Sequence, residues 1–178
     1  GQLLILVVLL ALSAFFSSSE TAFTTCNKIY MRTLAQENDP RAAKVLKITE
    51  NSGKMLSAIL IGNNVVNLSA SSLATSLAIR VFGSVAAGIA TGILTLLILI
   101  FGEISPKTIA TLRADKLALR FCHIIWALMT VLTPVIFVVS WLSQLFLRLV
   151  GVRPGEEVRA MTEEELRTIV DVGQESGV

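Results

Sequence analysis

Charged residues and cysteines are both scarce in this chain. Only 16% of its 178 residues are charged and the net charge is +2, whereas ordinary soluble domains carry about 25% charged residues. These values exclude an ordinary soluble globular protein, a disordered chain and a typical nucleic-acid binder. Two cysteines are too few for a disulfide-framed secreted module. With the single histidine they also cannot supply the nucleophile, base and orienting group of an enzyme, so we expect no catalytic activity.

Apolar residues, by contrast, make up 53% of the chain and gather in long runs. The first run covers residues 3–23, which is long enough to cross a bilayer at about 1.5 Å of helix rise per residue. A signal peptide is the alternative for this run, but no basic segment precedes it. Two further runs, residues 55–82 and 85–104, are separated by Gly83 and Ser84, which predict a tight turn. The sequence therefore predicts an all-α membrane protein with three transmembrane helices and additional cytoplasmic or juxtamembrane helices.

Basic residues indicate which segments face the cytoplasm. Residues 27–54 hold six basic residues against three acidic ones, and such an excess marks a cytoplasmic loop. Within this loop the Glu-Asn-Asp-Pro sequence at 37–40 predicts a helical hairpin, because Asn and Asp favour turns and proline is tolerated at a helix start. Basic residues also follow the third run, so this span returns the chain to the cytoplasm. They are Lys107, Arg113, Lys116 and Arg120.

The segment after the third span can be a fourth span or a shallow pair of helices. Residues 121–150 are largely apolar, but Pro134 removes a backbone donor within them. We favour two Pro-broken juxtamembrane helices, which leave the C-terminal tail in the cytoplasm, whereas a crossing helix would place the tail outside. Residues 151–178 carry seven acidic residues against three basic ones, and Thr162 with the glutamates after it predicts a capped helix outside the membrane.

Polar side chains recur within the predicted spans, where their presence in lipid is costly and therefore suggests a function. Ser13 and Ser17 are four residues apart and share one helix face, as do Asn63 and Asn67 on the second span. Glu103 stands near the end of the third span. Helix rise places Ser17, Asn63 and Glu103 in the cytoplasmic half of the membrane.

Pro106 adds a backbone oxygen to these groups. Proline has no amide hydrogen, so the carbonyl of Gly102, four residues earlier, loses its helical partner. Hydroxyl, amide, carbonyl and carboxylate oxygens at one depth suit a hard cation such as Mg²⁺ or Na⁺. Structural alternatives stay open, because serines can bond to their own helix, asparagines can join two helices, and Glu103 can pair with Lys107.

Four short motifs carry a resemblance to a known family. They are Ser13–Ala22, Ile61–Asn67, Phe101–Lys107 and Thr162–Leu166. In this order and spacing they closely resemble the transmembrane domain of the CorC/CNNM magnesium transporters, also called hemolysin-C-like proteins, over essentially the whole chain. The resemblance implies a multi-pass homodimer of the inner membrane, in which each subunit binds one Mg²⁺ inside the lipid bilayer and exports it in exchange for Na⁺. It also implies that a pair of CBS domains, which bind ATP and Mg²⁺, follows the acidic linker 151–178.

The resemblance further implies where the ion binds. Carried over residue by residue, the family's ion site falls on Ser13, Ser17, the corner formed by Gly62 and Asn63 with Asn67 nearby, Gly102 and Glu103, with Pro106 in a structural role. Ser18 and Ser19 stand where members of the family often have glycine or alanine, so the choice among the hydroxyl groups stays open.

The expected function is therefore magnesium export driven by sodium entry, through alternating access to a dehydrated ion. Two alternatives stay open. One is a membrane anchor and dimerisation module for cytoplasmic domains that sense ions or nucleotides. The other is a divalent cation channel, which would need a polar lining across the membrane, whereas residues 85–94 offer only Thr91.

Overall fold

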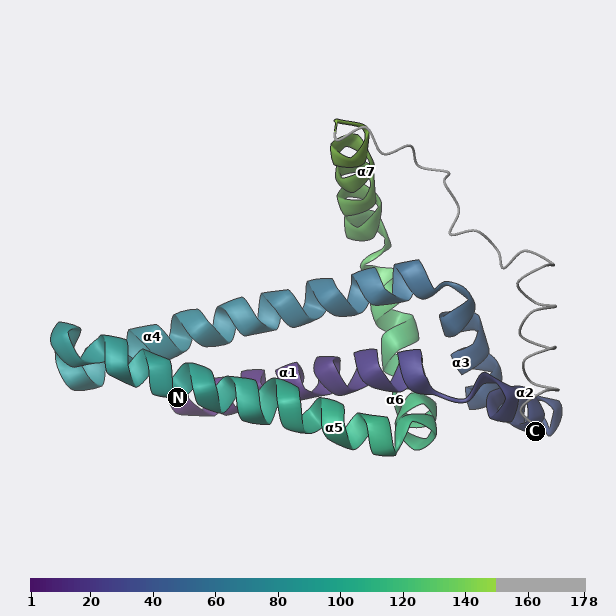
Figure 1. Ribbon diagram of the computed structural model, residues 1–178, viewed down its shortest axis with the longest axis horizontal. Coiled ribbons are helices and arrows are strands. Elements are labelled where there is room, and N and C mark those ends of the chain that lie inside the picture. The colour runs from purple at the N-terminus through teal and green to yellow at the C-terminus, as the bar shows by residue number, and fades with distance from the viewer. Residues whose placement is uncertain (150–178) are drawn as a thin grey trace, which may run out of the picture. The chain divides into compact units, whose positions relative to one another are not determined.

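The computed structural model describes residues 1–149, with the backbone alone for residues 84–87 and 148, and every element in this range is a helix (Figure 1). The predicted linker 151–178 and its capped helix lie outside the described residues. The described residues fall into two units, 1–136 and 137–149, and the second contains only the end of the last helix. The elements in chain order are α1 (Gln2–Thr25), α2 (Lys28–Gln36), α3 (Pro40–Glu50), α4 (Ser52–Ile98), the π-helix η1 (Leu99–Ile104), α5 (Ser105–Leu112), α6 (Ala114–Val131) and α7 (Thr133–Leu149).

Three helical segments are long and apolar enough to cross a membrane. They are Gln2–Thr25, Ser52–Gly83 and Gly88–Leu112, and they confirm the prediction of an all-α membrane protein with three candidate spans. Helices α6 and α7 pass the same test only as a bent pair, which would make a fourth span. The break between them lies at Leu132, two residues before Pro134, as expected for a proline near a helix start.

Helix α4 consists of two helices joined at Gly83. This glycine has φ 73° and ψ 174°, a conformation outside the helical region that only glycine adopts readily. The chain reverses its direction there, as the end of α4 in Figure 1 shows. The second and third candidate spans therefore form a hairpin, in agreement with the turn predicted at Gly83 and Ser84.

The helix of the third candidate span continues beyond residue 104, the end expected from the apolar run, and reaches Leu112. The π-helical turn η1 allows this continuation. The backbone N–H of Ser105 donates to the carbonyl of Ile100, five residues earlier, so the hydrogen-bonding pattern is already widened when it meets Pro106. The proline therefore alters the turn that precedes it without ending the helix.

Helices α2 and α3 form the expected helical hairpin. The side chain of Asn27 caps α2 by accepting hydrogen bonds from two backbone N–H groups of its first turn, and that of Asp39 caps α3 by accepting one from the backbone N–H of Arg41. Between the two helices Asn38 adopts φ 66°, a left-handed conformation that asparagine tolerates better than most residues. Pro40 occupies the start of α3, where its missing N–H costs nothing.

The apolar core of residues 1–136 lies at the end of the bundle that contains the α2–α3 hairpin. Phe23, Met31, Ile48, Met55 and Ile125 come from five different helices and are at most 1% exposed. In contrast, only 6% of the most apolar window of the third span is buried. Most of its apolar side chains thus face away from the described protein, which suits contact with lipid or with a second subunit.

Candidate functional site

The middle of α1 carries four serine hydroxyl groups that are buried in the protein. Ser13, Ser17 and Ser19 are fully buried, and Ser18 is 8% exposed. The hydroxyls of Ser18 and Ser19 donate to carbonyl oxygens of their own helix, four residues earlier, at 2.6 and 2.7 Å. This is the usual way in which a helix satisfies a serine. The two hydroxyls that the family resemblance left open are therefore already bonded, whereas those of Ser13 and Ser17 have no bond to their own helix.

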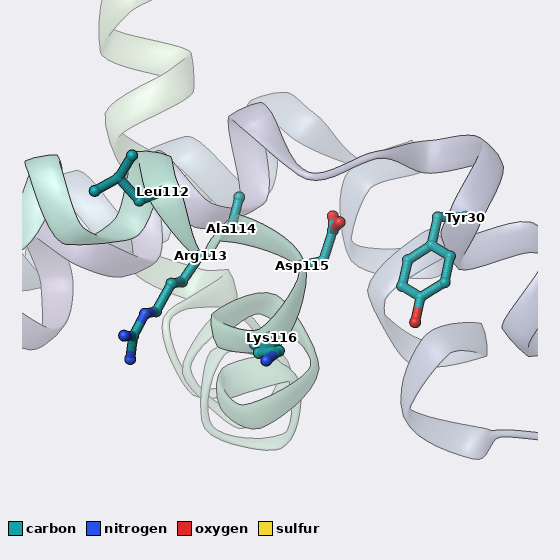
Figure 2. A pocket seen from close by; sticks show the side chains of 6 residues that line it. All are labelled: Tyr30, Leu112, Arg113, Ala114, Asp115 and Lys116. Carbon is teal, nitrogen blue, oxygen red and sulfur yellow. The ribbon is translucent and has the colours of Figure 1, made fainter.

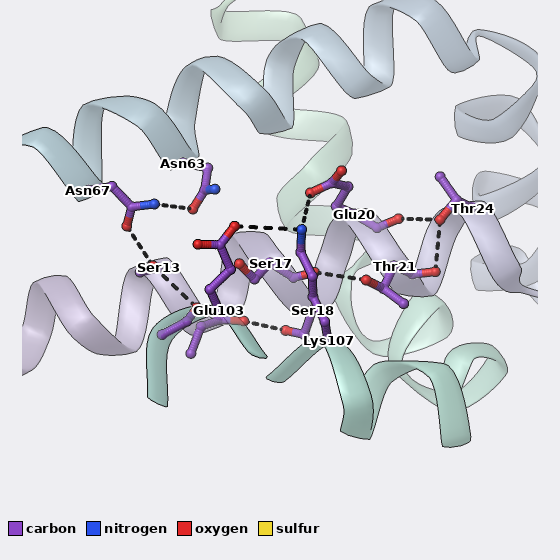
Figure 3. Close-up of polar contacts among 12 residues, drawn as sticks. Ser13, Ser17, Ser18, Glu20, Thr21, Thr24, Asn63, Asn67, Glu103 and Lys107 are labelled. Atoms are coloured by element: carbon purple, nitrogen blue, oxygen red, sulfur yellow. Dashed lines mark hydrogen bonds and ion pairs between the residues drawn. The ribbon is translucent and has the colours of Figure 1, made fainter. Parts of the chain in front are cut away.

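Ser13 connects α1 to both other spans. Its Oγ lies 2.6 Å from Oδ1 of Asn67 on α4 and 3.3 Å from the carbonyl oxygen of Gly102 on η1 (Figure 3). Three oxygen atoms thus meet with one hydroxyl hydrogen among them, because neither a carbonyl nor an amide oxygen can donate. The amide Nδ2 of Asn67 is directed toward Oδ1 of Asn63 at 3.5 Å. A cluster of oxygens that is short of hydrogen atoms is a suitable environment for a cation.

Ser17 has a hydroxyl oxygen that is buried and has no hydrogen-bond partner among the described residues. It lies one turn along α1 from Ser13, on the same face. Leaving a buried hydroxyl unbonded costs about 1–3 kcal/mol, so each such group in a native protein needs an explanation. A ligand that binds between the helices and is coordinated by this oxygen would explain the unbonded hydroxyl.

The two glycines of the predicted site allow α1 to approach the other spans closely. A Cβ on Gly102 would lie 3.0 Å from Oγ of Ser13 and 3.1 Å from Cδ1 of Leu10. A Cβ on Gly62 would lie 2.6 Å from two ring carbons of Phe16, which is too close for any side chain. Gly102 thus presents its carbonyl to α1, and Gly62 accommodates the aromatic ring.

Glu103 is placed in an ion pair. Its Oε1 lies 3.7 Å from Nζ of Lys107, one turn along the same helix, and the same Nζ lies 3.4 Å from Oε2 of Glu20 on α1 (Figure 3). The pairing with Lys107 is the structural alternative that the sequence had left open. The participation of Glu20, by contrast, is not among the predictions from the sequence. Its spacing from Ser13 and Ser17 (i, i+4 and i+7) places it on the same helix face and could have revealed it.

Within the described residues no group of three or more His, Cys, Asp or Glu side chains could hold a metal ion. The structure therefore brings together Ser13, Asn67 and Gly102, with Asn63 bonded to Asn67 and Ser17 one turn away. A cation bound there would depend mainly on neutral oxygen atoms. Glu103 would supply the negative charge from its neighbouring ion pair.

A separate cavity of about 490 Å³ opens at the end of the third span (Figure 2). None of the predicted ion-site residues lines it. Beside it, Oδ1 of Asp115 accepts a hydrogen bond of 2.8 Å from the backbone N–H of Asn27, which ties the α1–α2 connection to the start of α6. The residues that line the cavity are Tyr30, Leu112, Arg113, Ala114, Asp115 and Lys116.

Comparison with known proteins identifies the family. A family model described as the Cyclin M transmembrane N-terminal domain (CNNM) matches residues 4–178. A UPF0053 protein of Haemophilus influenzae is 37% identical over 97% of this chain and 41% of its own length, and the UPF0053 inner membrane protein YfjD of Escherichia coli is 36% identical over 89% and 37%. The Polyamine export protein of H. influenzae is 26% identical over 99% of this chain and 44% of its length. The chain thus spans less than half the length of these curated relatives. With its three candidate spans and these matches, the chain is a multi-pass membrane protein that belongs to the CNNM transmembrane-domain family.

Proposed function

We propose that this chain is the ion-conducting domain of a magnesium exporter of the inner membrane, coupled to sodium entry. The observation that carries the proposal is the buried hydroxyl of Ser17, which has no hydrogen-bond partner in the described part of the chain and lies one turn from the oxygens gathered at Ser13. The family membership and the relative named as an inner membrane protein support the membrane location, and the relative named as a polyamine export protein supports a transport role. A transmembrane-domain family also fits a protein without catalytic activity.

In the proposed mechanism the oxygens of the three spans replace water around Mg²⁺. Serine hydroxyls, asparagine amide oxygens and the Gly102 carbonyl are hard ligands of the kind that Mg²⁺ prefers, and they must approach octahedral geometry because this ion gives up its water reluctantly. The hydroxyl of Ser13 now joins α1, α4 and η1, so opening the site requires these contacts to rearrange. Gly62 would allow α1 and α4 to stay in close contact during that movement.

The proposed assembly is a homodimer with residues 27–54 and the C-terminal tail in the cytoplasm. The exposed apolar face of the third span provides an area for lipid and for a second subunit. In the full-length protein the segment after residue 150 would lead to a pair of CBS domains, through which ATP would regulate transport. No nucleic-acid partner is proposed.

Magnesium flux from proteoliposomes tests the proposal. We expect a lumenal indicator to report Mg²⁺ movement only when an opposing Na⁺ gradient is present. The Asn63→Ala variant should remain folded but show no Mg²⁺ flux. Ser69→Ala is a matched control, since this α4 serine is exposed and bonded to its own helix. Flux that ignores Na⁺ would favour a channel, and stabilisation by Mg²⁺ without flux would favour an anchoring or sensing module. Normal flux in Asn63→Ala would refute the proposed site.

One observation favours a second cargo, a polyamine. The carboxylates of Glu20 and Glu103 flank the ammonium group of Lys107, and a primary ammonium group on an alkyl chain is also what terminates a polyamine. The relative named as a polyamine export protein agrees with this cargo class. Adding spermidine to the same proteoliposomes separates the two cargoes. Export of spermidine with no Mg²⁺ flux would replace the magnesium proposal.

A further inference from the structure

Lys107 is the only cation found within ion-pair distance of Glu20 and Glu103 among the described residues. It lies on α5, one turn after Glu103, and reaches across to Glu20 on α1 (Figure 3). The lysine therefore contacts the one carboxylate of the predicted ion site.

The contacts of Lys107 are ion pairs without close hydrogen bonds. The two distances, 3.4 and 3.7 Å, exceed the range of 2.7–3.2 Å for a well-formed N–H···O bond. All three side chains are between 28% and 38% exposed, so none is locked in place by packing. An ammonium group held in this way neutralises the carboxylates but can move at small cost.

A divalent cation bound near Glu103 would compete with the ammonium group of Lys107 for its carboxylate. At equal distance it attracts a carboxylate twice as strongly as an ammonium group does, and it repels that ammonium group. Glu20 offers Lys107 a second carboxylate outside the proposed ligand set, at 3.4 Å. The ammonium group can therefore leave Glu103 and keep a partner.

We propose that Lys107 is a tethered competitor, whose ammonium group occupies Glu103 in the empty site and is displaced onto Glu20 when a divalent cation binds. The inference rests on the magnesium site proposed above and adds the residue that tunes its affinity. Binding becomes an exchange of one cation for another, so the site never presents an uncompensated carboxylate within the membrane, where such a charge is costly. The returning ammonium group also helps to release the ion.

The test compares Mg²⁺ titrations of the melting temperature for the chain in detergent. Removing the competitor in Lys107→Met should lower the Mg²⁺ concentration at half-maximal stabilisation by up to about fivefold, since a partly exposed ion pair contributes up to about 1 kcal/mol. Lys107→Gln is a second variant with the same expected direction. Lys107→Arg keeps the charge and should keep the wild-type midpoint. Lys47→Met is the matched control on α3, where the lysine is exposed and outside the site.

The sign of the change separates this role from a structural one. A lysine that only holds α1 to α5 would weaken ion binding when it is lost, whereas a competitor would strengthen it. A midpoint for Lys107→Met and Lys107→Gln that equals or exceeds the wild-type midpoint would overturn the inference while leaving the magnesium site intact. If the wild-type melting temperature does not respond to Mg²⁺, the proposed magnesium site fails and the inference fails with it.

Discussion

Replacing Ser17 with alanine should stabilise the metal-free protein and remove its response to magnesium. The hydroxyl of Ser17 is fully buried and has no hydrogen-bond partner within residues 1–149 as described, so the metal-free protein carries the desolvation cost of that group, about 1–3 kcal/mol. Alanine has nearly the same volume and no polar atom, so Ser17→Ala relieves this cost. For a chain of this length each kcal/mol corresponds to about 2–4 °C, which predicts a melting temperature higher by about 2–12 °C.

The assay is thermal unfolding in detergent, with EDTA and then with increasing Mg²⁺. A ligand that binds only the folded state raises the melting temperature of the wild type, whereas Ser17→Ala should show little or no increase. Ser19→Ala is the matched control, because this serine is equally buried but its hydroxyl donates to the Phe15 carbonyl. We expect Ser19→Ala to leave the metal-free melting temperature unchanged or lower, and to keep the response to Mg²⁺.

Two results would refute this reasoning. If Ser17→Ala lowers the metal-free melting temperature, the hydroxyl is bonded in the native protein and needs no ligand. If Ser17→Ala keeps the full response to Mg²⁺, the ion binds without this oxygen. Both results can be read against Ser19→Ala, which changes the same chemical group two residues away on the same helix.

Two further predictions concern packing and pH. Gly62→Ala should destabilise the protein by about 1–3 kcal/mol in thermal unfolding, because its Cβ would lie 2.6 Å from the Phe16 ring, whereas Gly53→Ala has open space and should be neutral or stabilising. The hydrogen bond from the Arg41 side chain, with the backbone N–H of Arg41, holds the pKa of Asp39 below its usual value. The stability that ionised Asp39 contributes is therefore complete above about pH 3.9 and is lost as the pH falls through the lower folded-state pKa. In unfolding measurements from pH 6 to pH 2, the free energy of unfolding should fall less steeply for Asp39→Asn than for the wild type, because asparagine keeps the capping oxygen but cannot titrate. An equally steep fall in both proteins would show that the paired carboxylate does not contribute.

The spans could be predicted because they depend on local properties of the chain. Apolar runs of sufficient length must form helices in lipid, since every backbone polar group there needs an internal partner. The reversal at Gly83 and the hairpin around Asn38 also follow from residues that tolerate positive φ. The continuation of the helix beyond residue 104 could not be predicted, because the widened turn at η1, which accommodates Pro106, depends on backbone hydrogen bonds that no single residue type specifies.

By itself, the sequence determined which oxygen-bearing residues lie inside the spans and on which helix faces, through the four-residue spacing of Ser13 with Ser17 and of Asn63 with Asn67. Only the tertiary structure decided which of these oxygens are available to a ligand and which are already bonded within their own helix. Each serine on α1 can bond to its own helix equally well as far as the sequence shows, and only the approach of α4 and η1 gives the Ser13 hydroxyl partners outside its helix, whereas the hydroxyls of Ser18 and Ser19 bond within it. The partners of a charge are also a property of helix packing, because the Glu20–Lys107 contact joins residues that are distant along the chain.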